Sequence, residues 1–364
     1  MGKRRSPLEN MVMDNEFWQN RNVFITGHTG FKGGWLSLWL YSLGANLSGY
    51  SLNPHTHPSF FKACCLGKLF DSDSRSDIQN YQALALDLNQ SNAEIVFHLA
   101  AQPLVRESYY SPVDTFGANL MGTVNLLEAV RKSNTVKVVV IITTDKCYEN
   151  KELGKPFSEN DPMGGEDPYS ASKACAELAT TAYRKSFLAK SAIQVATARA
   201  GNVIGGGDWS ADRLIPDFLR SIEENQKLII RSPKAIRPWQ HVLEPISGYI
   251  KLVEKLYHDG SLHASAWNFG PEENDAREVS WLADRMCQKF ETGSWRAETD
   301  MNSPKESGVL RLDSSKSKKL LGWRPQWNLD TALDNTMEWH SSYNCGYNMR
   351  EFSLNQIQTY STSL

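Results

Sequence analysis

The feature that most constrains the fold of this chain is a short apolar strand that runs directly into a glycine-rich turn. Residues 23–26 (Val-Phe-Ile-Thr) have the side chains of a buried strand, and glycines follow at positions 27, 30 and 33. At this spacing one glycine permits a tight turn, another lets backbone N–H groups approach a pyrophosphate, and the third packs the next helix closely on the sheet. An anion would lie at the positive end of that helix. The segment therefore predicts a dinucleotide site that contains Gly27, Thr29, Gly30, Phe31, Lys32 and Gly33.

Strands and helices alternate from this turn up to residue 202. The residue pattern predicts further strands at 46–50, 95–98, 136–143 and 195–200, and helices at 35–43, 115–131 and 169–187. Strands rich in valine and isoleucine that are separated by helices indicate a parallel sheet covered on both faces. We therefore expect an α/β fold with a doubly wound, Rossmann-type sheet.

The pattern loosens after residue 202, which predicts a second and smaller mixed α/β lobe. Helices are expected at 214–224, 244–257 and 279–290, and the strand at 267–269 is expected to return to the main sheet. The predicted division has an N-terminal tail, a dinucleotide-binding domain with a returning part, a substrate lobe in two pieces and a polar C-terminal tail that frays. These parts are 1–20, 21–202 with 238–270, 203–237 with 271–346, and 347–364.

Composition excludes several functional classes. The net charge is −2, so no surface for nucleic acid is indicated. The six cysteines form no C-x-x-C pair and no cluster with zinc spacing, so we expect free thiols, no metal site and a reducing, cytoplasmic location. No apolar run approaches the length of a membrane span, and the N-terminus lacks the apolar segment of a signal peptide.

The residues after the second predicted strand indicate which dinucleotide binds. Residues 50–55 contain no carboxylate for the ribose 2′-hydroxyl of NAD and no arginine for a 2′-phosphate. Ser51 and Asn53 are able to hydrogen-bond a ribose, which favours NAD. Asp73 and Ser74 are candidates to meet the adenine, although a polar surface turn explains them equally well.

A second constellation carries chemistry. The strand predicted at 136–143 ends in Thr144-Asp145-Lys146, and a helix further along carries Tyr169 and Lys173. Residues four apart share one face of a helix. An ammonium beside a phenol favours the phenolate, which makes tyrosine usable as a base near neutral pH. A solvated Tyr/Lys pair would be the alternative, but the glycine turn and the threonine-rich strand end favour a catalytic pair.

From about residue 21 to residue 330 the chain resembles the extended short-chain dehydrogenase/reductases. The resemblance rests on the glycine turn, on 98–101 (His-Leu-Ala-Ala), on Asn119, on the pair Tyr169 and Lys173, and on 199–203 (Arg-Ala-Gly-Asn-Val). It implies an NAD-dependent enzyme that acts on a nucleotide-linked sugar. It also implies that Leu99, Ala100, Ala101 and Asn119 join Tyr169 and Lys173 around the cofactor.

Within this family the chain is similar to the CDP-glucose 4,6-dehydratases. Dehydratases carry an acid where this chain has Asp145, whereas epimerases carry small residues. Further matching strings are 30–35, 101–106, 162–165, 202–209 and 237–242. The resemblance implies oxidation at carbon 4 by Tyr169 and NAD⁺, loss of water across carbons 5 and 6, and return of hydride to carbon 6. The product would be a 4-keto-6-deoxy sugar, a precursor for deoxysugar and lipopolysaccharide O-antigen biosynthesis.

The resemblance also assigns roles to single residues. Thr144 would hydrogen-bond the 4-oxygen, and Asp145 would protonate the departing 6-hydroxyl, which requires a carboxylic acid that burial keeps neutral. Lys146 replaces the glutamate base of related enzymes, and its role as a base or as a stabiliser of the enolate stays open. Six residues are expected to bind the substrate: Gln102, Arg106, Asn202, Arg213, Arg237 and Glu306.

Three alternatives and two further expectations accompany this interpretation. A nucleotide-sugar 4-epimerase or a decarboxylase would use the same scaffold, and an inactive NAD-binding scaffold protein would need no intact catalytic set. The helices at 115–131 and 169–187 are expected to pair across a two-fold axis in a homo-oligomer, a dimer or tetramer. Four tryptophans in apolar contexts are expected in the core: Trp239, Trp267, Trp323 and Trp327.

Overall fold

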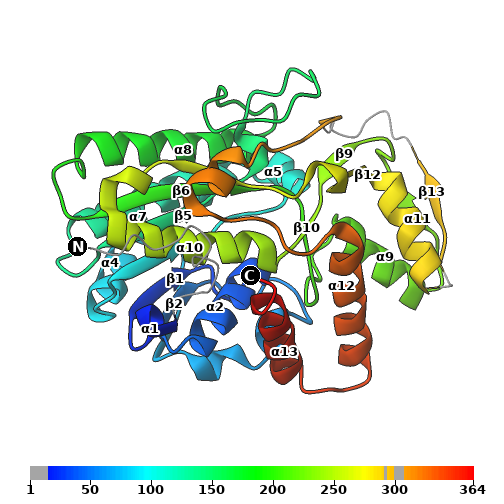
Figure 1. Ribbon diagram of the computed structural model, residues 1–364, viewed down its shortest axis with the longest axis horizontal. Coiled ribbons are helices and arrows are strands. Elements are labelled where there is room, and N and C mark those ends of the chain that lie inside the picture. Colours follow the sequence, from blue (N-terminus) through cyan, green and yellow to red (C-terminus); the bar gives the residue numbers. More distant parts are fainter. Residues whose placement is uncertain (1–14, 291–292, 299–306) are drawn as a thin grey trace, which may run out of the picture.

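A parallel sheet of seven strands organises the molecule (Figure 1). The computed structural model describes residues 15–290, 293–298 and 307–364. The strand order is β11-β6-β5-β4-β1-β2-β3, and every neighbouring pair is parallel. The strands are β1 (Asn22–Thr26), β2 (Asn46–Ser51), β3 (Ser72–Arg75), β4 (Ile95–His98), β5 (Val138–Ile142), β6 (Gln194–Ala200) and β11 (Ala266–Phe269). This order confirms the doubly wound fold, and the chain reverses direction across the sheet between β1 and β4.

Alternating side chains of the strands supply two separate cores. Ile25 and Val140 pack on one face with α2 (Phe31–Ser42) and α10 (Leu243–Asp259). Phe24 and Val139 point to the opposite face, where α4 (Tyr81–Gln90) and α7 (Gly122–Arg131) cover the sheet. Because both faces of the sheet are buried, β1, β4 and β5 are nearly continuous apolar runs, and the sequence predicted these three strands well.

The long helices lie where the sequence places them. The predicted helix at 169–187 is α8 (Pro168–Ser186), and Pro168 occupies its first position, where no backbone N–H is needed. The predicted helix at 115–131 consists of α6 (Pro112–Phe116), a π-helical turn at Gly117–Met121 and α7. These helices pack against α8 along one edge of the molecule (Figure 1).

The second half of the chain builds a smaller group of elements beside the sheet (Figure 1). Its apolar core includes residues of α9 (Leu214–Glu223), α11 (Val279–Phe290) and α12 (Leu329–Asn344). Short strands pair here: β7 (Val203–Ile204) with β10 (Gln240–His241), β8 (Leu228–Ile230) with β13 (Trp295–Ala297), and β9 (Ile236–Pro238) with β12 (Ala276–Glu278). The predicted return to the main sheet is confirmed by β11, which pairs with β6. The four tryptophans expected in the core are buried.

The expectation of a fraying tail at 347–364 is wrong. Residues Met349–Ser361 form α13, whose first turn is capped by the side chain of Asn348. Met349, Ile357 and Tyr360 enter the main core, and the Tyr360 ring stacks edge-on against Trp39 and Trp327. The buried face of this helix also contains the polar Ser353 and Gln356, so its overall composition concealed a buried stripe.

Part of the expected N-terminal tail also packs into the folded protein. A short helix, α1 (Asn15–Trp18), is present, and the fully buried Trp18 indole donates a hydrogen bond to Glu254 at 2.7 Å. The rest of the predicted tail, residues 1–14, lies outside the described residues. None of the helices in the described ranges is long and apolar enough to cross a membrane.

Candidate active site

The glycine turn adopts a geometry that only glycine allows. Gly27 has φ +75°, and a Cβ on it would lie 2.5 Å from the backbone nitrogen of Ala100. A Cβ on Gly33 would lie 2.2 Å from the carbonyl oxygen of Gly27. The side-chain hydroxyl of Thr29 bonds the end of β2, through Ser51 Oγ at 2.8 Å and the Leu52 carbonyl at 2.9 Å. The backbone amides at the start of α2 are therefore held against a cavity.

This cavity, of about 840 Å³, lies at the carboxyl ends of the sheet strands and extends into the smaller lobe. Its position at the point where the strand order reverses is the usual ligand site of open α/β sheets. All five predicted catalytic residues line it: Thr144, Asp145, Lys146, Tyr169 and Lys173. So do Gly27, Thr29, Gly30, Phe31, Lys32, Gly33, Leu99, Ala100 and Ala101 of the predicted cofactor set, and Gln102, Arg106, Asn202, Arg213 and Arg237 of the substrate set.

The structure corrects the residues that were expected to meet an adenine. Asp73 is paired with the buried His28, at 2.7 Å from Nε2, and with Arg75, at 2.7 Å between Nη2 and Oδ2. Neither Asp73 nor Ser74 belongs to the cavity wall, which at this end contains Asp77 and Ile78 instead. Because β3 ends at Arg75, the chain enters the cavity only after that residue.

Asn119 also has a different position from the one expected. It does not line the cavity but is buried, and its side chain accepts from the backbone nitrogen of Gln102 at 2.8 Å and donates to Ser172 at 2.9 Å. The Gln102 amide in turn donates to Thr115 at 2.9 Å. Asn119 therefore ties the loop after β4 to α8, one residue before Lys173, and acts on the cavity through that loop.

Tyr169 and Lys173 lie one turn apart on α8 and both are buried. Burial raises the pKa of the Tyr169 phenol to about 12, against the lowering effect of a hydrogen bond with Thr144. Burial also lowers the pKa of Lys173 to about 8, and its ammonium donates to the Ile142 carbonyl at 3.3 Å. Desolvation dominates the phenol pKa in the protein alone, and the opposing effects come from Thr144 and Arg213; a lowering by Lys173 stays a prediction.

Asp145 is the most unusual group in the cavity. Its carboxylate is almost fully buried, with Oδ1 accepting from the Thr144 hydroxyl at 3.1 Å. Oδ2 has no hydrogen-bond partner among the described residues. The Lys146 ammonium lies 3.9 Å from Oδ1, at the margin of an ion pair. Burying a carboxylate oxygen without a hydrogen-bond partner is energetically unfavourable. The arrangement therefore indicates that a bound ligand supplies the missing hydrogen bond.

Polar groups for an anionic substrate lie further along the cavity. Arg213 donates to Asp208 at 2.7 Å, and Arg106 donates to Asp212 at 2.9 Å. Arg237 is buried, and the Asn202 side-chain oxygen is buried without a partner. Glu306, expected near the ribose, lies outside the described residues.

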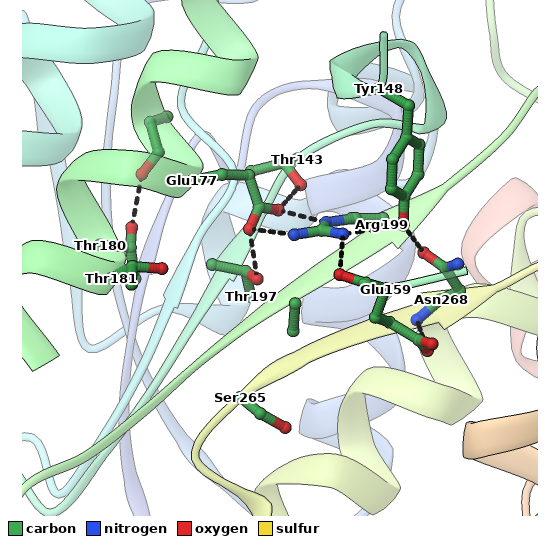
Figure 2. A network of polar contacts seen from close by, with 12 residues as sticks. Thr143, Tyr148, Glu159, Glu177, Thr180, Thr181, Thr197, Arg199, Ser265 and Asn268 are labelled. Carbon is green, nitrogen blue, oxygen red and sulfur yellow. Dashed lines mark hydrogen bonds and ion pairs between the residues drawn. The ribbon is translucent and has the colours of Figure 1, made fainter. Parts of the chain in front are cut away.

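A buried ion pair behind the catalytic residues was not predicted (Figure 2). Glu177 on α8 accepts two bonds from Arg199 on β6, at 2.9 and 2.8 Å, and one from Thr143 at the end of β5. Arg199 also donates to the Tyr148 hydroxyl at 2.7 Å. This network joins two strand ends to the helix that carries Tyr169. The two charges lie far apart in sequence on different elements, so no local pattern reveals the pair.

Comparison with known proteins agrees with this geometry. Residues 24–336 match the family described as GDP-mannose 4,6 dehydratase. The chain belongs to this family. It is 48% identical over 355 residues to a CDP-glucose 4,6-dehydratase of Salmonella typhimurium, with 96% of this chain and 98% of that protein covered. It is 26% identical over 292 residues to a UDP-glucose 4-epimerase of Lacticaseibacillus casei, covering 76% of this chain and 85% of that protein.

Solved structures share the fold of this GDP-mannose 4,6 dehydratase family member at lower identity. An epimerase from Methanothermobacter thermautotrophicus superposes with a TM-score of 0.80 at 21% identity, covering 95% of this chain and 99% of that one. A dTDP-glucose 4,6-dehydratase from Bacillus anthracis, solved with NAD, gives a TM-score of 0.73 at 20% identity, covering 88% and 97%. At these identities the likeness establishes the fold alone.

Proposed function

We infer that this family member is an NAD-dependent CDP-glucose 4,6-dehydratase, which converts CDP-D-glucose to CDP-4-keto-6-deoxy-D-glucose. The observation that carries the inference is Asp145, a buried acid with an unpartnered oxygen in the cavity beside Thr144 and Tyr169. The relative from Salmonella typhimurium, 48% identical over nearly the whole chain, supports the same activity.

The glycine turn fits a dinucleotide cofactor. Gly27 and Gly33 leave space that a Cβ would fill, and the amides at the start of α2 face it. Ser51 and Asn53 lie on the cavity wall where a ribose hydroxyl would be recognised, with no arginine for a 2′-phosphate in 50–55. When bound, NAD supplies the acceptor and the donor of hydride. The structural neighbours solved with NAD support this choice.

The residues around Tyr169 carry the oxidation. Its phenol takes the proton of the 4-hydroxyl while Thr144 holds the 4-oxygen. With a pKa near 12 in the protein alone, the phenol needs added positive charge to act as a base at neutral pH. Lys173 supplies part of this charge, and the positively charged nicotinamide ring supplies the rest on binding.

Asp145 and Lys146 carry the elimination. Once carbon 4 is a ketone, the proton on carbon 5 is acidic, and water leaves as Asp145 gives a proton to the 6-hydroxyl. Lys146 lies beside Asp145 on the cavity wall and is given one of two roles: its neutral amine takes the carbon 5 proton, or its cation stabilises the enolate while a water in the cavity takes that proton. Arg213, Arg237 and Asn202 bind the substrate diphosphate, since planar guanidinium groups suit phosphate oxygens.

The competing activities lack a comparable observation. A 4-epimerase needs no acid at the position of Asp145, and a scaffold protein needs no buried catalytic set. We further place the enzyme in the cytoplasm, in deoxysugar synthesis for lipopolysaccharide O-antigen, because the cysteines of the described chain are unpaired and the proposed product is a deoxysugar precursor. We also propose a homodimer formed through the helices at 105–131 and α8.

A substrate screen tests the function. The protein is incubated with CDP-, dTDP-, UDP- and GDP-glucose, and the alkaline absorbance of a 4-keto sugar is recorded. We expect product from CDP-glucose, with the others turned over much more slowly. Interconversion of glucose and galactose stereochemistry without a 4-keto product would replace the dehydratase by an epimerase.

A further inference from the structure

A lysine lies inside the glycine turn and faces the cavity. Lys32 is the second residue of α2, and its side chain lines the cavity next to Gly30 and Gly33. Its ammonium lies 5.9 Å from the ring centroid of Tyr249 on α10. Among the described residues it forms no ion pair with a carboxylate. A cation that is partly buried without a counter-charge is unfavourable unless a ligand supplies one.

The charged groups that face Lys32 come from several elements. Arg213 before α9 and Lys173 on α8 repel it, and Asp145 after β5 attracts it. Arg213 forms an ion pair with Asp208 at 2.7 Å. The Asp145 carboxylate that attracts Lys32 also lies 3.9 Å from the Lys146 ammonium. On α10, the Tyr249 hydroxyl is fully buried without a hydrogen-bond partner, and burial raises its pKa. The surroundings of the Lys32 ammonium therefore have cations in surplus, and the Tyr249 hydroxyl, which lies outside the cavity wall, has no partner among the described residues.

The position of Lys32 in the glycine turn indicates which anionic group of a ligand it would bind. The turn from Gly27 to Gly33 is where a dinucleotide diphosphate approaches backbone N–H groups. A lysine adds a mobile point charge to those fixed donors. We propose that the Lys32 ammonium binds the diphosphate of the cofactor and so positions the dinucleotide for hydride transfer. This rests on the NAD site of the proposed function and adds a side-chain contact to it.

The proposal has a consequence for protonation. Burial and the nearby Arg213 and Lys173 lower the pKa of Lys32 to about 7 in the protein alone. At pH 8 the amine is then mostly neutral, whereas a bound diphosphate favours the ammonium and raises the pKa. Binding at pH 8 should therefore take up a proton, and binding at pH 6, where Lys32 is already charged, should not.

Titration calorimetry in two buffers of different ionisation enthalpy measures this uptake. The probes are NAD⁺, ADP-ribose, which keeps the diphosphate without the nicotinamide, and AMP, which lacks the diphosphate. For the full-length wild-type protein at pH 8 we expect an uptake that approaches one proton with NAD⁺ and with ADP-ribose, and little with AMP. Lys32→Met should lose most of this uptake and bind both diphosphates roughly 10- to 100-fold more weakly.

Two further variants separate charge from structure. Lys32→Arg keeps a permanent cation, so it should retain much of the affinity but bind without proton uptake. Lys62→Met, on the exposed surface of α3 (Phe60–Ala63), should behave as wild type. Melting temperatures establish that Lys32→Met is folded, which is expected because the substitution removes a buried unpaired charge.

Clear outcomes would overturn the proposal. If Lys32→Met bound ADP-ribose as tightly as wild type, with the same proton uptake, Lys32 would not contact the diphosphate. If only NAD⁺ binding were weakened, Lys32 would act on the nicotinamide half instead. Failure of the proposed function would be seen separately. If the protein bound diphosphates through Lys32 but did not convert CDP-glucose, the proposed Lys32 contact would stand and the proposed dehydratase activity would fall.

Discussion

At the scale of single residues, the proposed dehydration depends on one buried oxygen. Oδ2 of Asp145 has no hydrogen-bond partner in the described part of the chain, while Oδ1 accepts from Thr144. A Cβ on Gly201 would lie 3.1 Å from Oδ2, so glycine keeps the space beside this oxygen open. The carboxyl group is thus fixed on one side and available on the other, as an acid that protonates a leaving group must be.

Replacing Asp145 by asparagine should therefore separate the two half-reactions. Asp145→Asn keeps the size of the side chain and can still accept from Thr144, but it cannot give an acidic proton. In a single turnover with CDP-glucose, NADH absorbance should appear and persist, and product formation should fall by roughly 10²-fold or more. The matched comparison is Tyr169→Phe, in which NADH should form slowly or not at all. Product release by Asp145→Asn at the wild-type rate would remove its acid role.

The residues that the sequence proposed as catalytic lie together on the cavity wall, whereas two of those proposed for the adenine end do not line it. Tyr169 and Lys173 are fixed by helical spacing, and Thr144 and Asp145 follow a strongly apolar strand, so local patterns suffice. The polar β3 (Ser-Asp-Ser-Arg) has no hydrophobic periodicity because it is a short, mostly exposed edge strand. The sequence therefore did not show where β3 ends. Only the structure shows that Asp77, and not Asp73, lines the cavity.

At the scale of elements, α13 is joined to the main core by a hydrogen bond to a buried carboxyl group. Glu244, fully buried on α10, accepts from the Tyr360 hydroxyl at 2.5 Å and from the backbone of Trp327 at 2.7 Å. The sequence could not reveal this contact, because Glu244 and Tyr360 meet only when α13 packs against α2 and α12 (Figure 1). The polar residues of α13 gave no apolar repeat strong enough to indicate a helix.

This contact predicts a dependence of stability on pH. Burial raises the pKa of Glu244 to about 7, above its ordinary value of 4.5, so the folded protein binds more protons than the unfolded chain between these values. The free energy of unfolding should fall by about 3 kcal/mol as the pH rises from about 4 to about 8. Urea titrations should show this slope flattened in Glu244→Gln and unchanged in Glu338→Gln, which alters an exposed carboxylate on α12. If Glu244→Gln showed the same slope as wild type, the pH dependence of stability would arise from another titratable group.

At the scale of the whole molecule, three adjacent helices carry apolar side chains that are exposed in the described part of the chain. Tyr110 on α5 (Val105–Tyr110) is 77% exposed, Val113 on α6 is 82% exposed and Leu178 on α8 is 58% exposed. These helices pack against one another beside the sheet (Figure 1). Exposed apolar residues gathered on adjacent helices are typical of an interface between subunits, and a two-fold axis would place each helix against its copy.

The proposed dimer can be broken without touching the catalytic residues. Wild-type protein should scatter light with about twice the chain mass of 41.0 kDa. The double variant Val113→Asp/Leu178→Asp places four charges in the paired surface of a dimer, which costs desolvation and repulsion and should give the single-chain mass. Leu262→Asp is the control, because Leu262 is 81% exposed on the 3-10 turn Gly260–His263, away from these helices. Circular dichroism establishes that the double variant is folded. A monomeric wild type, or a folded double variant that remains dimeric, would exclude α6 and α8 as the contact surface.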